Sequence, residues 1–208
     1  MASTPSTRPV RHRRSGAEVR ELLATAAREA FAEKGYAGTS TKDIAIRAGV
    51  AEVLIFRYFG TKAGLFDGAV LDTFEQFIDQ YAVRWSERGA RGESVEDIAR
   101  EYIAMLYAFF EENRALLVAL LSAKAHHPST ALRLNELFAR LENIVREATR
   151  EYGIPSRDAA TTVRLTFGMV LSTVIHADVL FAGGPRLSER RLVDELTAYT
   201  LQGISDSS

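Results

Sequence analysis

Residues 40–66 read STKDIAIRAGVAEVLIFRYFGTKAGLF, a pattern that predicts two short helices joined by a tight turn. Ser40 is suited to cap the first helix, because its hydroxyl can accept a hydrogen bond from an early backbone N–H and Asp43 follows at the spacing of a capping box. Gly49 can then adopt the left-handed conformation that a sharp turn requires. Residues 40–59 therefore fit a helix-turn-helix, a motif that places its second helix in the major groove of DNA.

The second helix is expected to have two faces with different chemistry. Its inner face, which would pack with the preceding helices, carries Val50, Ile55 and Phe59. Its outer face carries Glu52, Val53, Phe56 and Arg57. In the major groove Glu52 would accept from a cytosine amine, Val53 and Leu54 would meet a thymine methyl, and Arg57 would reach guanine or phosphate. The alternative for Arg57 is a solvated position on the surface.

Phosphate contacts are expected from hydroxyls near the helix ends and from nearby cations. Lys62 stands at the start of the next helix, where the dipole disfavours a cation, so a phosphate held there by the ammonium and the free N–H groups would explain it. The alternative is a surface lysine. The basic arm over residues 1–16 either lies in a minor groove or stays solvated. The residues expected at DNA are Arg11, Arg13, Arg14, Thr39, Ser40, Thr41, Lys42, Ala51, Glu52, Val53, Leu54, Phe56, Arg57, Tyr58 and Lys62.

The charge of the 208-residue chain is unevenly distributed. Residues 1–62 hold 11 Lys or Arg and 6 Asp or Glu, a net charge of +5, whereas residues 63–208 hold 15 and 21, a net charge of −6. A basic front end favours a polyanionic partner, although chance segregation of surface charge would give the same numbers. The chain has no cysteine, which excludes disulfides, thiolate zinc sites and cysteine nucleophiles and fits a cytoplasmic location.

Hydrophobic periodicity predicts helices along the whole chain and no strand of useful length. The expected helices cover residues 17–34, 40–48, 51–58, 61–87, 94–110, 115–123, 134–148, 156–181 and 188–201. Residues 115–123 are apolar nearly all round and are expected to be buried. The longest apolar region, residues 165–182, is interrupted by His176 and Asp178, so we expect no membrane span. No apolar core follows the basic N-terminus, so we expect no signal peptide.

Several sequence positions at fixed spacing point to one family. They are Thr39-Ser40-Thr41-Lys42-Asp43-Ile44-Ala45, Ala48-Gly49-Val50 and Tyr58-Phe59 with Lys62 and Leu65, preceded by FAEKGYAGTS at residues 31–40. Over residues 17–70 this pattern resembles the TetR-type transcriptional regulators. The chain departs from the family at the start of the recognition helix, where Ala51 replaces a usual serine and Val53-Leu54 a frequent Gly-Thr. Phe56 lacks the hydroxyl of the first aromatic residue in the family's YxYF run.

The resemblance implies an all-α protein of about nine helices. Residues 17–62 would form a three-helix DNA-binding domain, and residues 63–208 a helical ligand-binding and dimerisation bundle. It also implies a homodimer that binds a palindromic operator in double-stranded DNA and represses transcription until a small apolar or aromatic effector releases it. No cofactor and no metal are expected.

For the dimer, the resemblance implies an interface formed by the last two long helices. Gly168 and Ser172, four residues apart, would allow close helix approach, although a helix buried inside one protomer would have the same pattern. The residues expected at this interface are Phe167, Gly168, Leu171, Ser172, Ile175, Val179, Leu192, Leu196 and Tyr199.

For the effector, the resemblance implies a pocket between the central helices. Aromatic and methionine side chains at helical spacing are candidates for its walls, with histidines as hydrogen-bonding groups, and plain core packing is the alternative. The candidates are Phe77, Tyr81, Trp85, Tyr102, Met105, Phe109, His126, Phe138, Phe167 and His176.

Two other classes of protein compete with this interpretation. A helical metalloenzyme would need Glu-x-x-His pairs. The residues three positions before His126, His127 and His176 are instead Ala123, Lys124 and Thr173. HExxH, GxSxG, Walker and GxGxxG motifs are also missing from the sequence, so no enzyme is expected. The remaining alternative is an α-helical ligand-binding or interaction bundle that does not bind regulatory DNA.

Overall fold

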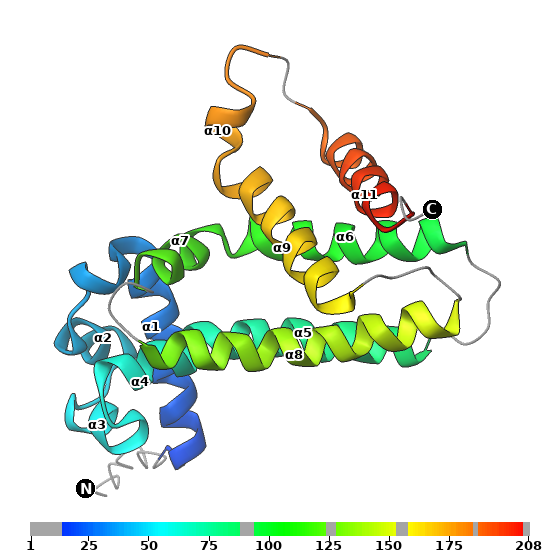
Figure 1. The fold of residues 1–208 in the computed structure, drawn as a ribbon. Coiled ribbons are helices and arrows are strands. Elements are labelled where there is room, and N and C mark those ends of the chain that lie inside the picture. The colour runs from blue at the N-terminus through cyan, green and yellow to red at the C-terminus, as the bar shows by residue number, and fades with distance from the viewer. Residues whose placement is uncertain (1–13, 88–93, 124–127, 153–157, 185–186, 206–208) are drawn as a thin grey trace, which may run out of the picture.

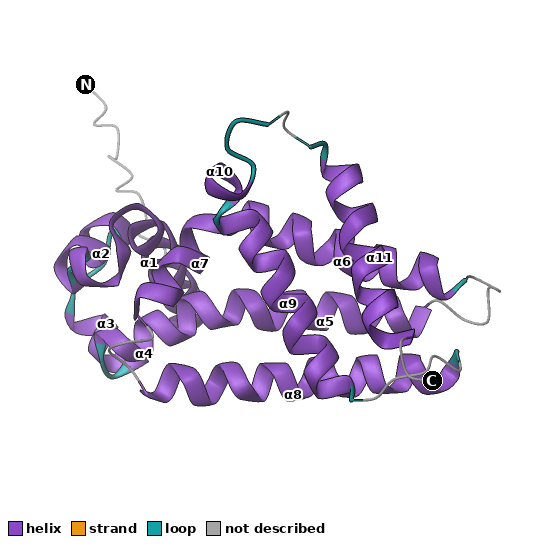
Figure 2. Ribbon diagram, turned by 45° about the horizontal axis from the view of Figure 1, so that its top comes forward, coloured by secondary structure: helices purple, strands orange, loops and turns teal. Residues whose placement is uncertain are grey.

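The computed structural model describes residues 14–87, 94–123, 128–152, 158–184 and 187–205. The regular structure in these segments is helical, and they contain no strand (Figure 2). The expected all-α fold is therefore confirmed. Among the described helices, none combines the length and the apolar character that a membrane crossing needs.

Three helices pack together at one end of the molecule (Figure 1). They are α1 (Gly16–Gly38), α2 (Thr41–Ala48) and α3 (Val53–Phe59). Ser15 starts α1 with a capping box, in which its hydroxyl accepts the Glu18 N–H at 3.2 Å and its own N–H donates to the Glu18 carboxylate at 2.6 Å. Gly16, expected in the arm, is thus the first residue of the helix, and Ser15 is its N-cap. Gly35, with φ of 68°, interrupts the helix near its expected end.

A continuous helical segment leads from this end into the rest of the molecule. It comprises α4 (Lys62–Phe66), the π-helical turn η1 (Asp67–Leu71) and α5 (Asp72–Glu87). Thr61 caps its start, its hydroxyl accepting the Gly64 N–H at 2.9 Å. All five residues of η1 are buried. Gly68 allows the Phe59 ring to approach closely, because a Cβ there would lie 3.2 Å from a ring carbon. The π turn therefore sits where the small helical end joins the longer helices.

The remaining helices complete the molecule. They are α6 (Val95–Glu112), α7 (Arg114–Ala123), α8 (Pro128–Glu151), α9 (Ala159–Ile175), α10 (Ala177–Leu180) and α11 (Glu189–Ser205). In Figure 2, α8 runs alongside α5, while α6, α9 and α11 pack against one another. The helix expected over residues 156–181 is broken at His176, which has φ of −105° and ψ of 19° and separates α10.

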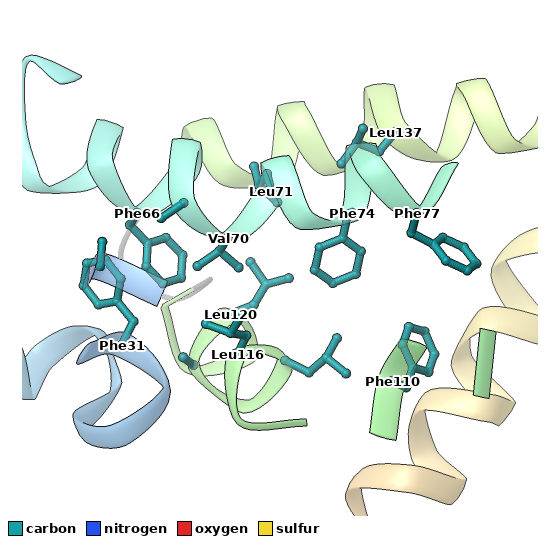
Figure 3. Close-up of a cluster of buried hydrophobic side chains, with 14 of the residues drawn as sticks. Phe31, Phe66, Val70, Leu71, Phe74, Phe77, Phe110, Leu116, Leu120 and Leu137 are labelled. Atoms are coloured by element: carbon teal, nitrogen blue, oxygen red, sulfur yellow. The ribbon is translucent and has the colours of Figure 1, made fainter. Parts of the chain in front are cut away.

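One hydrophobic core joins the two ends of the molecule (Figure 3). Phe31 and Phe66 meet edge to face, with ring centroids 5.0 Å apart, and the core continues along α5 to Phe74 and on to Phe110 in α6. Helix α7 packs along α1 and brings Leu116 and Leu120 into this core. Residues 115–123 were expected to be buried, and one face of α7 is buried, whereas its other side is exposed at Val118 and Leu121.

Candidate nucleic-acid interface

The turn between α2 and α3 has the geometry that the sequence predicts. Ser40 caps α2, its hydroxyl accepting the Asp43 N–H at 3.0 Å. Gly49 adopts φ of 64° and ψ of 38°, and its N–H bonds the Ile46 carbonyl at 3.1 Å. The Asp43 carboxylate lies 3.7 Å from Lys34 Nζ, so it ties α2 to α1. The caps at both ends of α2 fix the direction in which α3 leaves the turn.

Helix α3 begins at Val53, two residues later than expected. Ala51 and Glu52 lie in the turn, and the Glu52 carboxylate accepts the Thr41 hydroxyl at 2.6 Å. This bond ties the start of α3 to the start of α2. Glu52, expected on the outer face, is half-buried and turned toward the domain rather than free to meet a base.

The expected division of α3 into two faces is present in the structure. Ile55 is fully buried, whereas Val53 is 68 % exposed and Phe56 is 49 % exposed. Arg57 is also exposed, and its guanidinium carbon lies 5.9 Å from the centroid of the Tyr58 ring. Large apolar side chains therefore face solvent on the helix that would enter the groove.

Arg14, Arg57 and Tyr58 lie near the start of α1, beside the turn. The Tyr58 hydroxyl lies so close to Gly16 that a Cβ there would be 3.0 Å away. Arg14 Nη1 donates to the Gly49 carbonyl at 3.4 Å, which places this side chain at the helix-turn-helix. With Arg57 beside Tyr58, this corner presents two guanidinium groups and a phenol near the N-terminus of α1. Arg11 and Arg13 lie outside the described residues.

Two expected contact residues point into the domain instead. Thr39 is buried, and its hydroxyl lies 2.7 Å from the Gly35 carbonyl and 3.0 Å from the Ala30 carbonyl. Lys62 Nζ donates to the Tyr36 carbonyl at 2.7 Å and lies 4.3 Å from the Tyr36 ring centroid. Partial burial lowers the pKa of Lys62. Both side chains hold the end of α1, because the Gly35 kink leaves carbonyls that need donors.

The residues expected at an effector pocket do not gather in one cavity. Phe138 and Phe167 line a cavity of about 240 Å³ between α7, α8 and α9, with ring centroids 4.9 Å apart. Tyr81 and Tyr102 line a smaller one of about 70 Å³. The Tyr102 hydroxyl is buried there and has no hydrogen-bond partner among the described residues, and burial raises its pKa.

The other candidates for the pocket lie elsewhere. Phe77, Met105 and Phe109 line an open groove between α5 and α6. Trp85 meets the Tyr152 ring edge to face at 5.6 Å. His176 is exposed at the break between α9 and α10, and His126 lies outside the described residues. The pattern of aromatic residues marked the interior of the bundle but did not distinguish its separate cavities.

The residues expected at a dimer interface are exposed, half-buried or buried in the protomer. Gly168, Val179 and Tyr199 are exposed, and a Cβ on Gly168 would meet no atom within 4 Å. Leu196 is buried within the protomer, whereas Phe167 is half-buried and packs against Phe110 and Phe138. The other half-buried members are Leu171, Ser172, Ile175 and Leu192. The structure adds two exposed apolar side chains that were not expected, Leu165 and Leu180.

Comparison with known proteins finds relatives of the helix-turn-helix region. Residues 23–69 match the model of the bacterial regulatory proteins of the tetR family. An HTH-type transcriptional repressor of Mycobacterium tuberculosis is 49 % identical over 71 residues, which cover 32 % of this chain and 37 % of that protein. The nucleoid occlusion factor SlmA of Vibrio vulnificus is 27 % identical over 135 residues, which cover 63 % of this chain and 66 % of SlmA.

Solved structures are similar over most of the chain. FadR of Bacillus subtilis, solved in complex with stearoyl-CoA, has a TM-score of 0.70 at 21 % identity and covers 88 % of this chain and 98 % of its own. FadR of Bacillus halodurans has the same TM-score and coverage at 22 % identity. These likenesses show the fold, and the family model together with the repressor relative identifies the helix-turn-helix. Residues 23–69 therefore match the tetR family of bacterial regulatory proteins, and the chain as a whole has the fold of these solved structures.

Proposed function

We propose that this protein is a sequence-specific DNA-binding transcriptional repressor. The observation that carries the proposal is the exposed outer face of α3, held by Ile55 in the core and by the capped turn at Gly49. A helix so mounted can enter the major groove with its outward side chains against the base edges. The net charge of +5 over residues 1–62 supplies attraction for phosphate.

Phosphate contacts in this proposal come from two places on the domain. Ser40, Thr41 and Lys42 stand at the N-terminus of α2, where free N–H groups and the helix dipole favour an anion. Arg14 and Tyr58, with Arg57, form the corner beside the start of α1. Contacts at both places would fix the position of α3 along the groove, leaving the outer residues of α3 to read the bases.

We place the effector in the cavity between α7, α8 and α9. Its walls are mostly apolar, and its cationic group, Arg164, is paired with Glu142 and lies 5.4 Å from the Phe138 ring centroid. Because this charge is compensated, the cavity favours an uncharged apolar or aromatic compound. Helix α7 lines the cavity and also packs along α1. A ligand that prefers a shifted α7 would thus change the position of the DNA-binding helices.

A homodimer completes the proposal. Leu165, Val179, Leu180 and Tyr199 expose apolar surface on α9, α10 and α11, and Gly168 leaves room for a partner helix. An interface there would bury this surface and relate the two α3 helices by a twofold axis. Two such helices about 34–36 Å apart fit successive major grooves on one side of a palindrome.

Selection of bound sequences from a random duplex pool tests the function. We expect the purified full chain to enrich a palindromic consensus. Val53→Asp would abolish enrichment, because it places a carboxylate against the base edges and phosphates. Val83→Asp is the matched control, since Val83 is also exposed, at 54 %, but lies on α5. A wild-type chain that enriches no sequence, or that leaves DNA at moderate salt, would favour the interaction bundle instead.

The effector role has its own test. Uncharged aromatic and aliphatic compounds that raise the melting temperature of the chain are expected to lower its affinity for the selected operator. A compound that binds tightly but leaves operator affinity unchanged would contradict the proposed release, because it would bind both states equally.

A further inference from the structure

The outer face of α3 presents apolar groups to solvent where a DNA-reading helix usually presents hydrogen-bonding groups. Val53 is 68 % exposed, Phe56 is 49 % exposed and Ala51 is exposed just before them. We call these three residues the reading face. Ile55 between them is fully buried. The reading face is thus not part of the hydrophobic core, and its exposure to water does not stabilise the fold.

Two polar side chains border the reading face: Glu52 is bonded within the domain, whereas Arg57 is exposed and supplies phosphate contacts in the proposed function. The Glu52 carboxylate accepts the Thr41 hydroxyl at 2.6 Å. The Arg57 guanidinium lies beside the Tyr58 ring, whose hydroxyl is at the start of α1. The reading face itself therefore offers no side-chain donor or acceptor to a base edge.

The chemistry of the major groove then restricts what such a face can recognise. Donors and acceptors of guanine, adenine and cytosine would lose water without gaining a partner there, which is unfavourable. The thymine C5-methyl group is the apolar feature of the four base pairs in this groove. Contact between Val53 or Phe56 and a thymine methyl would bury apolar surface on both sides.

We propose that Val53 and Phe56 recognise thymine methyl groups, so that each operator half-site is specified in part by thymines read through apolar contact. This inference rests on the proposed DNA-binding function. Val53 is the first residue of α3, and the N-terminal residues of a recognition helix are those that contact base edges. Phe56 lies three residues on, about 4.5 Å further along the helix axis and on the same side. That spacing is close to the step of about 3.4 Å between successive nucleotides, so methyls on neighbouring base pairs are within reach.

Deoxyuridine provides a direct test, because it lacks only the C5-methyl group of thymidine and keeps every hydrogen-bonding group. The operator from the pool selection would be made with each thymidine replaced in turn by deoxyuridine, and affinity measured by fluorescence anisotropy. Burial of one methyl group corresponds to about a fourfold change in affinity. We therefore expect about fourfold weaker binding for replacements at one or two positions in each half-site, and little change elsewhere.

Variants of the chain assign the methyl contacts to residues. Val53→Ala and Phe56→Ala should each weaken binding to the thymidine operator. Each should also remove the sensitivity to deoxyuridine at the thymine that the replaced side chain contacts. Val83→Ala, on α5, should keep the full sensitivity. Undiminished sensitivity in both α3 variants would assign the methyls to other residues and overturn the proposal.

The outcome also separates this proposal from the function on which it rests. If the wild-type chain enriches an operator but tolerates every deoxyuridine within twofold, thymine recognition is overturned and DNA binding stands. If no operator is enriched, DNA binding itself fails and the proposal falls with it.

Discussion

Thr39→Val separates two roles that the same side chain could have. The sequence alone suggested a hydroxyl that meets phosphate, whereas the structure buries it against the Gly35 and Ala30 carbonyls at 2.7 and 3.0 Å. Valine has nearly the same shape but no donor, so the substitution leaves buried carbonyls without this partner. Such a loss costs about 1–2 kcal/mol in the free energy of unfolding. In a chain of this size we expect the melting temperature to fall by roughly 2–8 °C.

The assay combines thermal unfolding, followed by circular dichroism, with operator binding measured well below the transition. We expect Thr39→Val to unfold earlier while the folded variant keeps wild-type affinity. Thr149→Val is the matched control, because the Thr149 hydroxyl donates to the Arg146 carbonyl of its own helix at an exposed site. Its effect should stay within about 0.5 kcal/mol. An unchanged melting temperature with weaker binding in Thr39→Val would refute the structural role.

Three further substitutions probe the DNA surface and the bundle. Arg57→Ala should weaken operator binding by about 1–3 kcal/mol. It should relax the sequence preference if Arg57 contacts a base, or lower the salt dependence of binding if Arg57 contacts a phosphate. Unchanged affinity would show that Arg57 is not at the interface. Lys62→Met should lower the free energy of unfolding by about 1 kcal/mol, through loss of the bond to the Tyr36 carbonyl, and leave the salt dependence of binding unaltered; a salt slope reduced by about one would instead indicate a phosphate contact. Tyr102→Phe removes a buried hydroxyl that has no partner among the described residues, so chemical denaturation should show equal or greater stability; a loss above about 1 kcal/mol would mean that the hydroxyl is bonded in solution.

The helix-turn-helix could be predicted because its signals are local. Ser40 and Gly49 act on the backbone within a few residues, and the burial of Ile55 follows from the periodicity of one helix. The start of α3 was harder to predict, because Glu52 bonds Thr41, eleven positions away. The contact of Glu52 with α2, rather than the helix propensity of Glu52, thus accounts for the start of α3.

The orientation of individual side chains depended on tertiary contacts that no spacing encodes. Thr39 and Lys62 had the chemistry of phosphate ligands, but the kink at Gly35 exposed carbonyls that both now satisfy. In the bundle, Phe138 and Tyr102 each lie on the apolar face of their helix, so the sequence predicts burial for both. Which of two cavities each residue faces depends on how α8 and α6 pack against α9.

Site-specific crosslinking tests most directly whether the outer face of α3 meets DNA. The chain has no cysteine, so Val53→Cys introduces a unique thiol that can carry a photoreactive maleimide. Val83→Cys provides a matched site of similar exposure on α5. We expect the label at position 53 to crosslink to the selected operator, with suppression by excess unlabelled operator, and the label at position 83 to give none. Equal yields from the two positions, or no crosslink from position 53 while the labelled protein still binds the operator, would contradict the placement of α3 in the major groove.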